Sequence, residues 1–190
     1  MNRRSFSIFF VSDAFKVGHL VDEAHVVAHK ARYGELDSSA TAYVNSFRRA
    51  VARLKGSSYI KHYELHNHSA SLYFYSSYTS FQKWNTSNTS VESFEKLFGT
   101  KQAICKLLFE ATVFMFKELD FLEQISIEIP SNGRLYTASV TRNELYEHLD
   151  CTLSHVKDDQ SAHFYLFCRE ADVKRFAEQF VKMKRLRRKR

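Results

Sequence analysis

The residues of this chain best suited to bind a charged ligand are the cations at its C-terminal end. Residues 182–190 contribute seven of the 28 Lys and Arg residues and no acid, so the remaining residues balance 21 bases against 21 acids. This basic tail therefore accounts for the whole formal net charge of +7. Dense cations favour a polyanion, because phosphates that they neutralise release condensed counterions. We expect phosphate contacts from Lys182, Lys184, Arg185, Arg187, Arg188, Lys189 and Arg190.

A second group of cations has the spacing of one helix face. Between residues 38 and 55, apolar residues recur every three or four positions, and the opposite side carries Arg48, Arg49, Arg53 and Lys55. Residues three or four apart lie on the same side of a helix, and Arg is the side chain that most often reads guanine in the major groove. These four cations are the second predicted nucleic-acid contact. An ordinary solvated helix surface explains the same pattern and stays open as the alternative.

Aromatic and histidine side chains alternate along residues 59–66 and 72–78. Their rings could form a stacking platform for unpaired bases, but aromatic strands usually contribute to a protein core. The same region supplies the enzymatic alternative, a metal-independent nuclease built from Lys61, His62, Glu64 and His66. Such sites assemble in space and leave no linear motif.

The sequence carries no recognisable signature of catalysis or of cofactor binding. It lacks the Gly-x-Ser-x-Gly, Walker, dinucleotide and kinase patterns, and it has only five Gly residues. His25 and His29 are four residues apart, and His62, His66 and His68 are close in sequence, but neither group has the HExxH pattern or a nearby Cys. We therefore predict no enzyme, no metal and no cofactor.

Composition indicates a folded protein in a reducing compartment. Hydrophobic residues make up 44% of the 190 residues, which is enough for a core, and the single Pro leaves little material for a linker. The three Cys residues are odd in number and widely spaced, which is atypical of a disulfide framework. No apolar run reaches the length of a membrane span. We expect a cytoplasmic protein, or a nuclear or nucleoid-associated one if the tail acts as an address or a DNA anchor.

Hydrophobic spacing predicts the elements that position these residues. Strands are expected at residues 5–11, 59–66, 72–78, 125–129, 135–140 and 163–168, with a hairpin turn at Asn132-Gly133. Helices are expected at residues 13–31, 38–55, 91–98, 101–119 and 143–149. A final helix after residue 168 should run directly into the basic tail. Its inward side is predicted to carry Val173, Phe176, Ala177, Phe180 and Met183.

This order of elements predicts an α+β fold in a single domain, residues 1–190. Residues 1–56 would form a strand and a helical hairpin, residues 57–186 an α+β body, and residues 182–190 the basic tail. A mainly antiparallel sheet of about five or six strands, with two hairpins, would pack with the N-terminal helical hairpin, a buried central helix and a basic C-terminal helix.

The functional prediction is a nucleic-acid-binding protein without enzymatic activity, with DNA favoured over RNA. It would act as a regulator or accessory factor, with no membrane partner. A homodimer is plausible from small apolar residues spaced along one helix at Ala14, Val17, Val21, Ala24, Ala28 and Ala31. The alternatives are a protein-interaction module with a solubilising or targeting tail, and the small nuclease described above.

Overall fold

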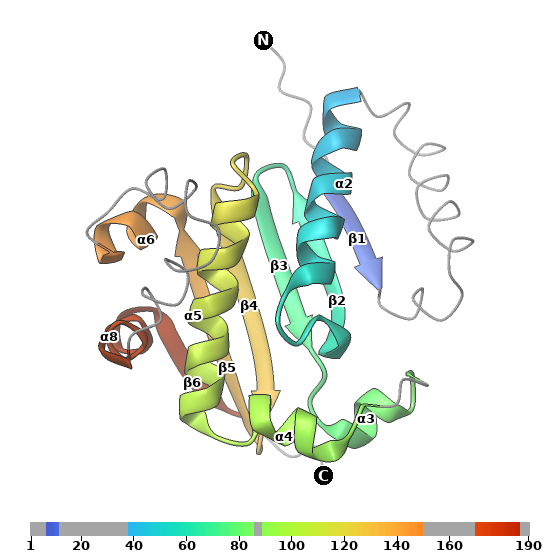
Figure 1. Ribbon diagram of the computed structural model, residues 1–190, viewed down its shortest axis with the longest axis vertical. Helices are drawn as coiled ribbons and strands as arrows, with labels where there is room; N and C mark the ends of the chain where they lie inside the picture. The colour runs from blue at the N-terminus through green and yellow to red at the C-terminus, as the bar shows by residue number, and fades with distance from the viewer. Residues whose placement is uncertain (1–6, 12–37, 86–88, 150–169, 187–190) are drawn as a thin grey trace.

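A computed structural model describes residues 7–11, 38–85, 89–149 and 170–186 of the chain. Its centre is a six-stranded sheet in which the strands lie side by side in chain order, β1-β2-β3-β4-β5-β6 (Figure 1). The strands are β1 (Ser7–Val11), β2 (Ile60–His66), β3 (Ser69–Phe74), β4 (Gln124–Ser131), β5 (Arg134–Thr141) and β6 (Val181–Arg185). All neighbouring strands are antiparallel except β3 and β4, which are parallel. The predicted α+β fold with a mainly antiparallel sheet is confirmed.

The parallel strands β3 and β4 require a crossover connection, and this connection contains three helices. These are α3 (Tyr78–Gln82), α4 (Val91–Phe98) and α5 (Lys101–Glu118). Serine and threonine caps start them: the side chains of Ser77, Ser90 and Thr100 each accept a hydrogen bond from the backbone N–H three residues later. The short helix α3 is a correction to the sequence analysis, which extended the preceding strand to Tyr78.

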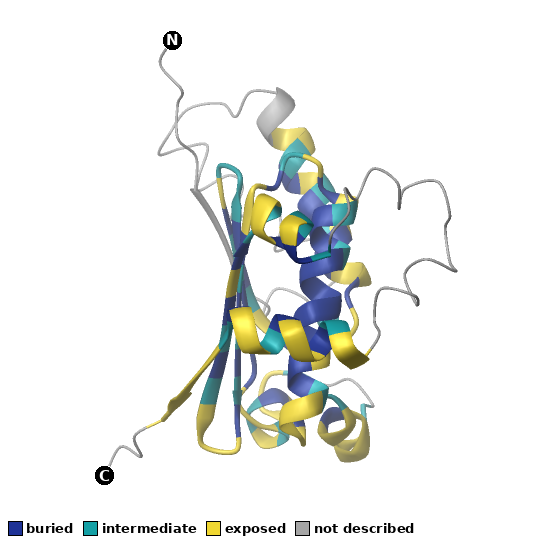
Figure 2. Cartoon of the chain, turned by 90° about the vertical axis from the view of Figure 1, so that its left-hand side faces the viewer, coloured by how far each residue is buried: buried dark blue, intermediate teal, exposed yellow. Residues whose placement is uncertain are grey.

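The remaining described helices are α2 (Ser38–Arg53), α6 (Arg142–Leu149) and α8 (Glu170–Phe180), with a 3-10 turn, η2 (Ser57–Tyr59), after α2. Figure 2 shows the described helices gathered on one side of the sheet. The strands alternate accordingly, because the residues that face the helices are buried and their neighbours are not. Among the described residues, the other face of the sheet has no helix against it.

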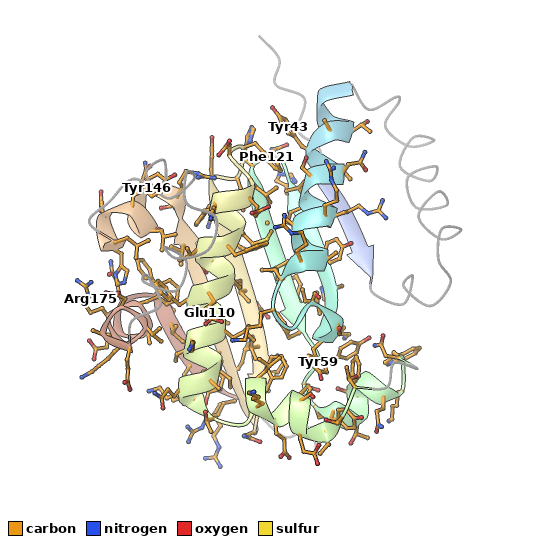
Figure 3. The ribbon with its side chains drawn as sticks, in the orientation of Figure 1. Tyr43, Tyr59, Glu110, Phe121, Tyr146 and Arg175 are labelled. Atoms are coloured by element: carbon orange, nitrogen blue, oxygen red, sulfur yellow. The ribbon has the colours of Figure 1, made fainter. Side chains whose placement is uncertain are left out.

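Helix α5 lies in the middle of this helical layer. Eleven of its 18 residues are buried, and it contacts α2, α4, α8, β4 and β5. A helix that is apolar on nearly every side must be enclosed, since any exposed side would leave apolar surface in water. The predicted buried central helix is therefore confirmed. Its buried acid, Glu110, bonds the Lys55 amino group at 2.9 Å (Figure 3).

The hairpin between β4 and β5 forms at the predicted Asn-Gly pair. Asn132 and Gly133 have φ angles of 49° and 72°, the left-handed values that this two-residue turn requires. The turn fixes the register that pairs Ser131 with Arg134 and runs to Gln124 with Thr141. Correct turn chemistry thus places Ile125, Ile127 and Ile129 on the buried face of the sheet.

Two predicted elements lie outside the described residues. They are the helix at residues 13–31, which includes His25, His29 and the small-residue seam, and the strand at residues 163–168. The predicted homodimer therefore stays a prediction. Within the described ranges, no helix combines the length and apolar character needed to cross a membrane.

The C-terminal segment differs from its sequence-based description. Helix α8 buries Val173, Phe176 and Phe180 as expected, but it ends at Phe180 and the chain continues as strand β6. The placement of Met183 on an inward helix face is wrong, because Met183 is in β6 and 48% exposed. The three acids and two bases of α8 also show that the cations belong to the strand and not to the helix. Hydrogen bonding along the free edge of β5 explains the change, since Val181–Arg185 pair with Arg134–Ala138.

Arg142 joins the end of α5 to the start of α6. Its guanidinium donates to the carbonyl oxygens of Leu122 at 2.8 Å, Phe116 at 2.9 Å and Leu119. It also donates to the Tyr146 hydroxyl at 2.8 Å and lies 5.0 Å from the centre of the Phe116 ring. The last carbonyls of a helix have no partner within the helix and carry partial negative charge. The Arg142 cation therefore suits this position, where it bonds Phe116 in the last turn of α5, the C-cap residue Leu119 and Leu122 beyond the helix.

Replacing Arg142 by Met should lower the free energy of unfolding by about 3 kcal/mol, because hydrogen bonds to charged groups contribute about 1.5–3 kcal/mol and the carbonyls lose their partner. Arg142→Lys should recover part of this loss. Arg175→Met is the matched control, since Arg175 lies on the outside of α8 (Figure 3) and, among the described residues, forms an ion pair with Asp172. It should cost less than about 1 kcal/mol. Urea denaturation would measure all three, and equal effects for Arg142→Met and Arg175→Met would contradict this role.

Candidate nucleic-acid interface

Strand β6 displays the described part of the basic tail on the edge of the sheet. It pairs with β5 on one side, and no other described strand pairs with its second side. Lys182, Lys184 and Arg185 are exposed, and no ion pair is recorded for them within the described parts of the chain. Arg187, Arg188, Lys189 and Arg190 lie outside the described residues. In Figure 2 the strand runs away from the helical layer toward the C-terminus.

Register divides these cations between the two faces of the sheet. Lys182 pairs with Thr137 and Lys184 with Leu135, which are residues of the open face, whereas Arg185 pairs with Arg134. The backbone N–H of Leu186 donates to the Gly133 oxygen at 2.8 Å, which holds the end of the strand beside the hairpin turn. Arg134 therefore joins the three β6 cations. These four residues, Arg134, Lys182, Lys184 and Arg185, are called the β6 cluster below.

The four cations predicted on the second helix separate into two pairs. Arg53 bonds Glu118 at 2.6 Å and lies 5.6 Å from the centre of the Phe114 ring, so helix α5 supplies its counter-charge. Lys55 is similarly held by Glu110. Arg48 and Arg49 instead line a hollow beside β2 together with Asn45, Ala52 and Tyr63.

The β6 cluster and the cations of α2 do not form one surface. Strands β3, β4 and β5 lie between β2, beside which α2 sits, and β6, so four strand spacings of about 4.8 Å separate them by roughly 19 Å. Figure 1 shows α2 over one end of the strand order and β6 at the other. Any single ligand that contacts both groups must span the sheet.

The open face of the sheet is polar, and it brings together residues from five strands. The register aligns one row across it, in strand order His62, Tyr73, Glu128, Thr137 and Lys182. The imidazole of His62 stacks on the Tyr73 ring, with centroids 4.1 Å apart and planes 15° apart. The other aromatic residues of the predicted stacking platform are mostly in the core, including Tyr59, Tyr63, Phe74 and Tyr75. Sequence reasoning had no signal for this row, because it depends on the parallel register of β3 and β4.

The residues of the predicted nuclease are only partly assembled. His62 Nε2 and Glu64 Oε1 are 3.8 Å apart, which is an ion-pair distance when the imidazole is protonated but is longer than a hydrogen bond. Lys61 is exposed beside an irregularity in the β2–β3 register, between Ile60 and His62. The nuclease stays a prediction. His68 has a structural contact, since its Nδ1 lies 2.8 Å from the Phe121 oxygen.

In the described part of the chain, no three His, Cys, Asp or Glu side chains are grouped so that they could hold a metal ion. Comparisons with known proteins found no matching family model, no similar curated protein and no similar solved structure.

Burial lowers the pKa of the His62 imidazole below its usual value near 6.5, against the opposing effect of the Glu64 and Glu128 carboxylates; the Lys61 charge lowers it further. The folded state thus favours the neutral ring. Its contribution to stability is complete above pH 6.5 and is lost as the pH falls through the lowered pKa.

His62→Gln should therefore lose less stability than the wild type between pH 8 and pH 5. Urea midpoints at the two pH values measure this, and the same loss in both proteins would refute it.

Proposed function

We propose that the protein binds DNA without catalysing a reaction on it, and that the β6 cluster anchors the phosphate backbone. The observation that supports this most directly is the exposure of Lys182, Lys184 and Arg185 on an edge strand, with no recorded acidic partner among the described residues. Cations held on a strand lose less conformational freedom on binding than cations on an unstructured chain. Four more cations follow in the sequence and would extend the same contact.

The repeat of a β-strand suits a nucleic-acid strand. Residues on one face of a β-strand lie about 6.8 Å apart, and phosphates two nucleotides apart on one DNA strand also advance by about 6.8 Å along the helix axis. Lys182 and Lys184, which share the open face, can therefore face phosphates of one strand at the same time. This agreement favours a backbone contact and provides no base recognition, so an accessory factor or regulator would need further contacts for sequence specificity.

The open face offers a place for such contacts. Lys182 and Lys184 share this face with the stacked His62–Tyr73 pair, and a base that leaves its stack can lie on an aromatic ring. The Glu128 carboxylate in the same row can accept a hydrogen bond from the amino group of cytosine. We place the DNA backbone along β6 and assign the open face to bases. The setting would be the cytoplasm, a nucleoid or a nucleus, wherever the DNA is held.

Neutralising the β6 strand in K182Q/K184Q/R185Q should weaken binding to a labelled 20-base-pair duplex by more than about tenfold at 0.1 M salt. It should also make the plot of log affinity against log salt shallower by about 2.7, at about 0.9 per lost phosphate contact. With a single strand the change should be about 2, since each contact then contributes about 0.7. Fluorescence anisotropy over a salt series measures both quantities.

The matched control removes the same charge elsewhere, in K83Q/K96Q/K101Q, three exposed lysines associated with α3, α4 and α5. This variant should keep nearly the wild-type slope. An unchanged slope in the β6 variant, or the same change in both variants, would exclude β6 as the anchor. If wild-type protein binds neither oligonucleotide, DNA binding itself is refuted, and the protein-interaction module becomes the better explanation of the exposed strand.

A further inference from the structure

A hollow between α2 and β2 has a lining that suits an anion. Its volume is about 520 Å³, within the range of small-molecule sites. The described residues that line it are Asn45, Arg48, Arg49, Ala52 and Tyr63. Four of these five side chains can donate hydrogen bonds and none of the five is acidic, so the described part of the lining favours negative charge.

Arg48 is fixed against the buried wall of this hollow. Tyr63 is only 5% exposed, and burial raises the pKa of its phenol, while the charge of Arg48 and a hydrogen bond from it lower that pKa in part. The Tyr63 ring also packs edge-on against Phe47 in the core, with centroids 5.7 Å apart. A guanidinium held by a rigid phenol is already oriented before a ligand arrives, which reduces the entropic cost of binding.

Charge pairing distinguishes Arg49 from the cations that follow it at residues 53 and 55. Arg53 and Lys55 are neutralised by Glu118 and Glu110 of α5. Arg49 is exposed, and the described residues supply it with no recorded ion pair. Helix α2 thus carries Arg53, which pairs with an acid of α5, and, one turn earlier, two arginines that line the hollow. Two guanidiniums around one hollow are the arrangement that recognises phosphate oxygens in pairs.

We infer that this hollow is a phosphate-binding site, separate from the β6 cluster and independent of it. Arg48 and Arg49 would bind the phosphate oxygens, and Asn45 and the Tyr63 hydroxyl would donate further hydrogen bonds. Ala52 and the Tyr63 ring leave apolar surface beside these donors, which suits the organic part of a phosphate ester. The phosphate could belong to a small ester or to a nucleic-acid backbone, and the two sources give different results in the experiment below.

Titration of the full chain with inorganic phosphate, at constant ionic strength, should show saturable binding by calorimetry. Arg49→Gln should weaken it by at least about tenfold, since one charged hydrogen-bond pair is lost. Arg53→Gln is the matched control, because it removes an equal charge from the same helix at a position already paired with Glu118; it should change the affinity less than about twofold. Thermal unfolding checks that both variants remain folded.

Asn45→Asp provides a second variant, because it keeps the side-chain shape and places a carboxylate in the hollow. It should weaken phosphate binding at least as strongly as Arg49→Gln. Tyr63→Phe removes one neutral donor and should have a smaller effect than either. The inference is overturned if wild-type protein shows no saturable phosphate binding, or if Arg49→Gln and Asn45→Asp bind phosphate as the wild type does.

Two further measurements identify the source of the phosphate and separate this inference from the proposed DNA binding. K182Q/K184Q/R185Q should keep its phosphate affinity, and a loss there would place the bound phosphate on β6 and refute the hollow. If Arg49→Gln weakens duplex binding by the same factor as phosphate binding, the site takes a backbone phosphate. If duplex binding is unchanged while phosphate binding falls, the site takes a small phosphate ester. Either result supports a phosphate site.

Discussion

The enclosure of helix α5 is the constraint on which the rest of the structure depends. A helix with Leu107, Leu108, Phe109, Val113 and Phe116 all buried cannot be stable in water on its own, and fully burying each such side chain contributes about 1.5–3 kcal/mol. The sheet covers one side of it, and α2, α4 and α8 cover others. The two buried polar side chains of α5 are also hydrogen-bonded, since the Thr112 hydroxyl donates to the Leu108 carbonyl oxygen and the Glu110 carboxylate accepts from Lys55.

This arrangement determines where a ligand can bind. The described helices gather on one face around α5, so the other face and the β6 edge are the parts of the sheet where polar side chains meet solvent (Figure 2). The same packing uses Glu118 and Glu110 of α5 to hold Arg53 and Lys55. Formation of the core therefore separates the cations of α2 and the turn after it into two that pair with acids of α5 and two, Arg48 and Arg49, that line the hollow.

Much of the fold could be predicted from local patterns. The Asn132-Gly133 turn, the caps at Ser90 and Thr100 and the apolar periodicity of α5 each leave a signal within a few residues. The end of α8 could not be predicted in this way, because VKMKR suits a helix as well as a strand, and the free edge of β5 decides between them. Helix α3 has a weaker signal in the reciprocal Ser77–Ser80 cap, which the strand-like pattern before it obscured.

The candidate site was less predictable than the fold, for a related reason. Sequence identifies which residues are cationic, but it does not show which of them an acid of α5 will neutralise. Glu110 and Glu118 are more than 50 residues from Lys55 and Arg53 along the chain. The row from His62 to Lys182 likewise depends on pairings between strands far apart in sequence. Spacing alone could identify the basic face of this helix, but it could not show which of its cations pair with acids of α5 and which line the hollow.

The side of β6 that pairs with no described strand also has a consequence for the behaviour of the protein on its own. An uncovered sheet edge offers its backbone groups to any other extended chain, including a second copy of itself, and this is a common route to aggregation. Two copies joined through β6 would bring like charges from Lys182, Lys184 and Arg185 close together, and the repulsion opposes that assembly. The cations that are proposed to bind DNA thus also oppose association between copies of the protein when no DNA is bound.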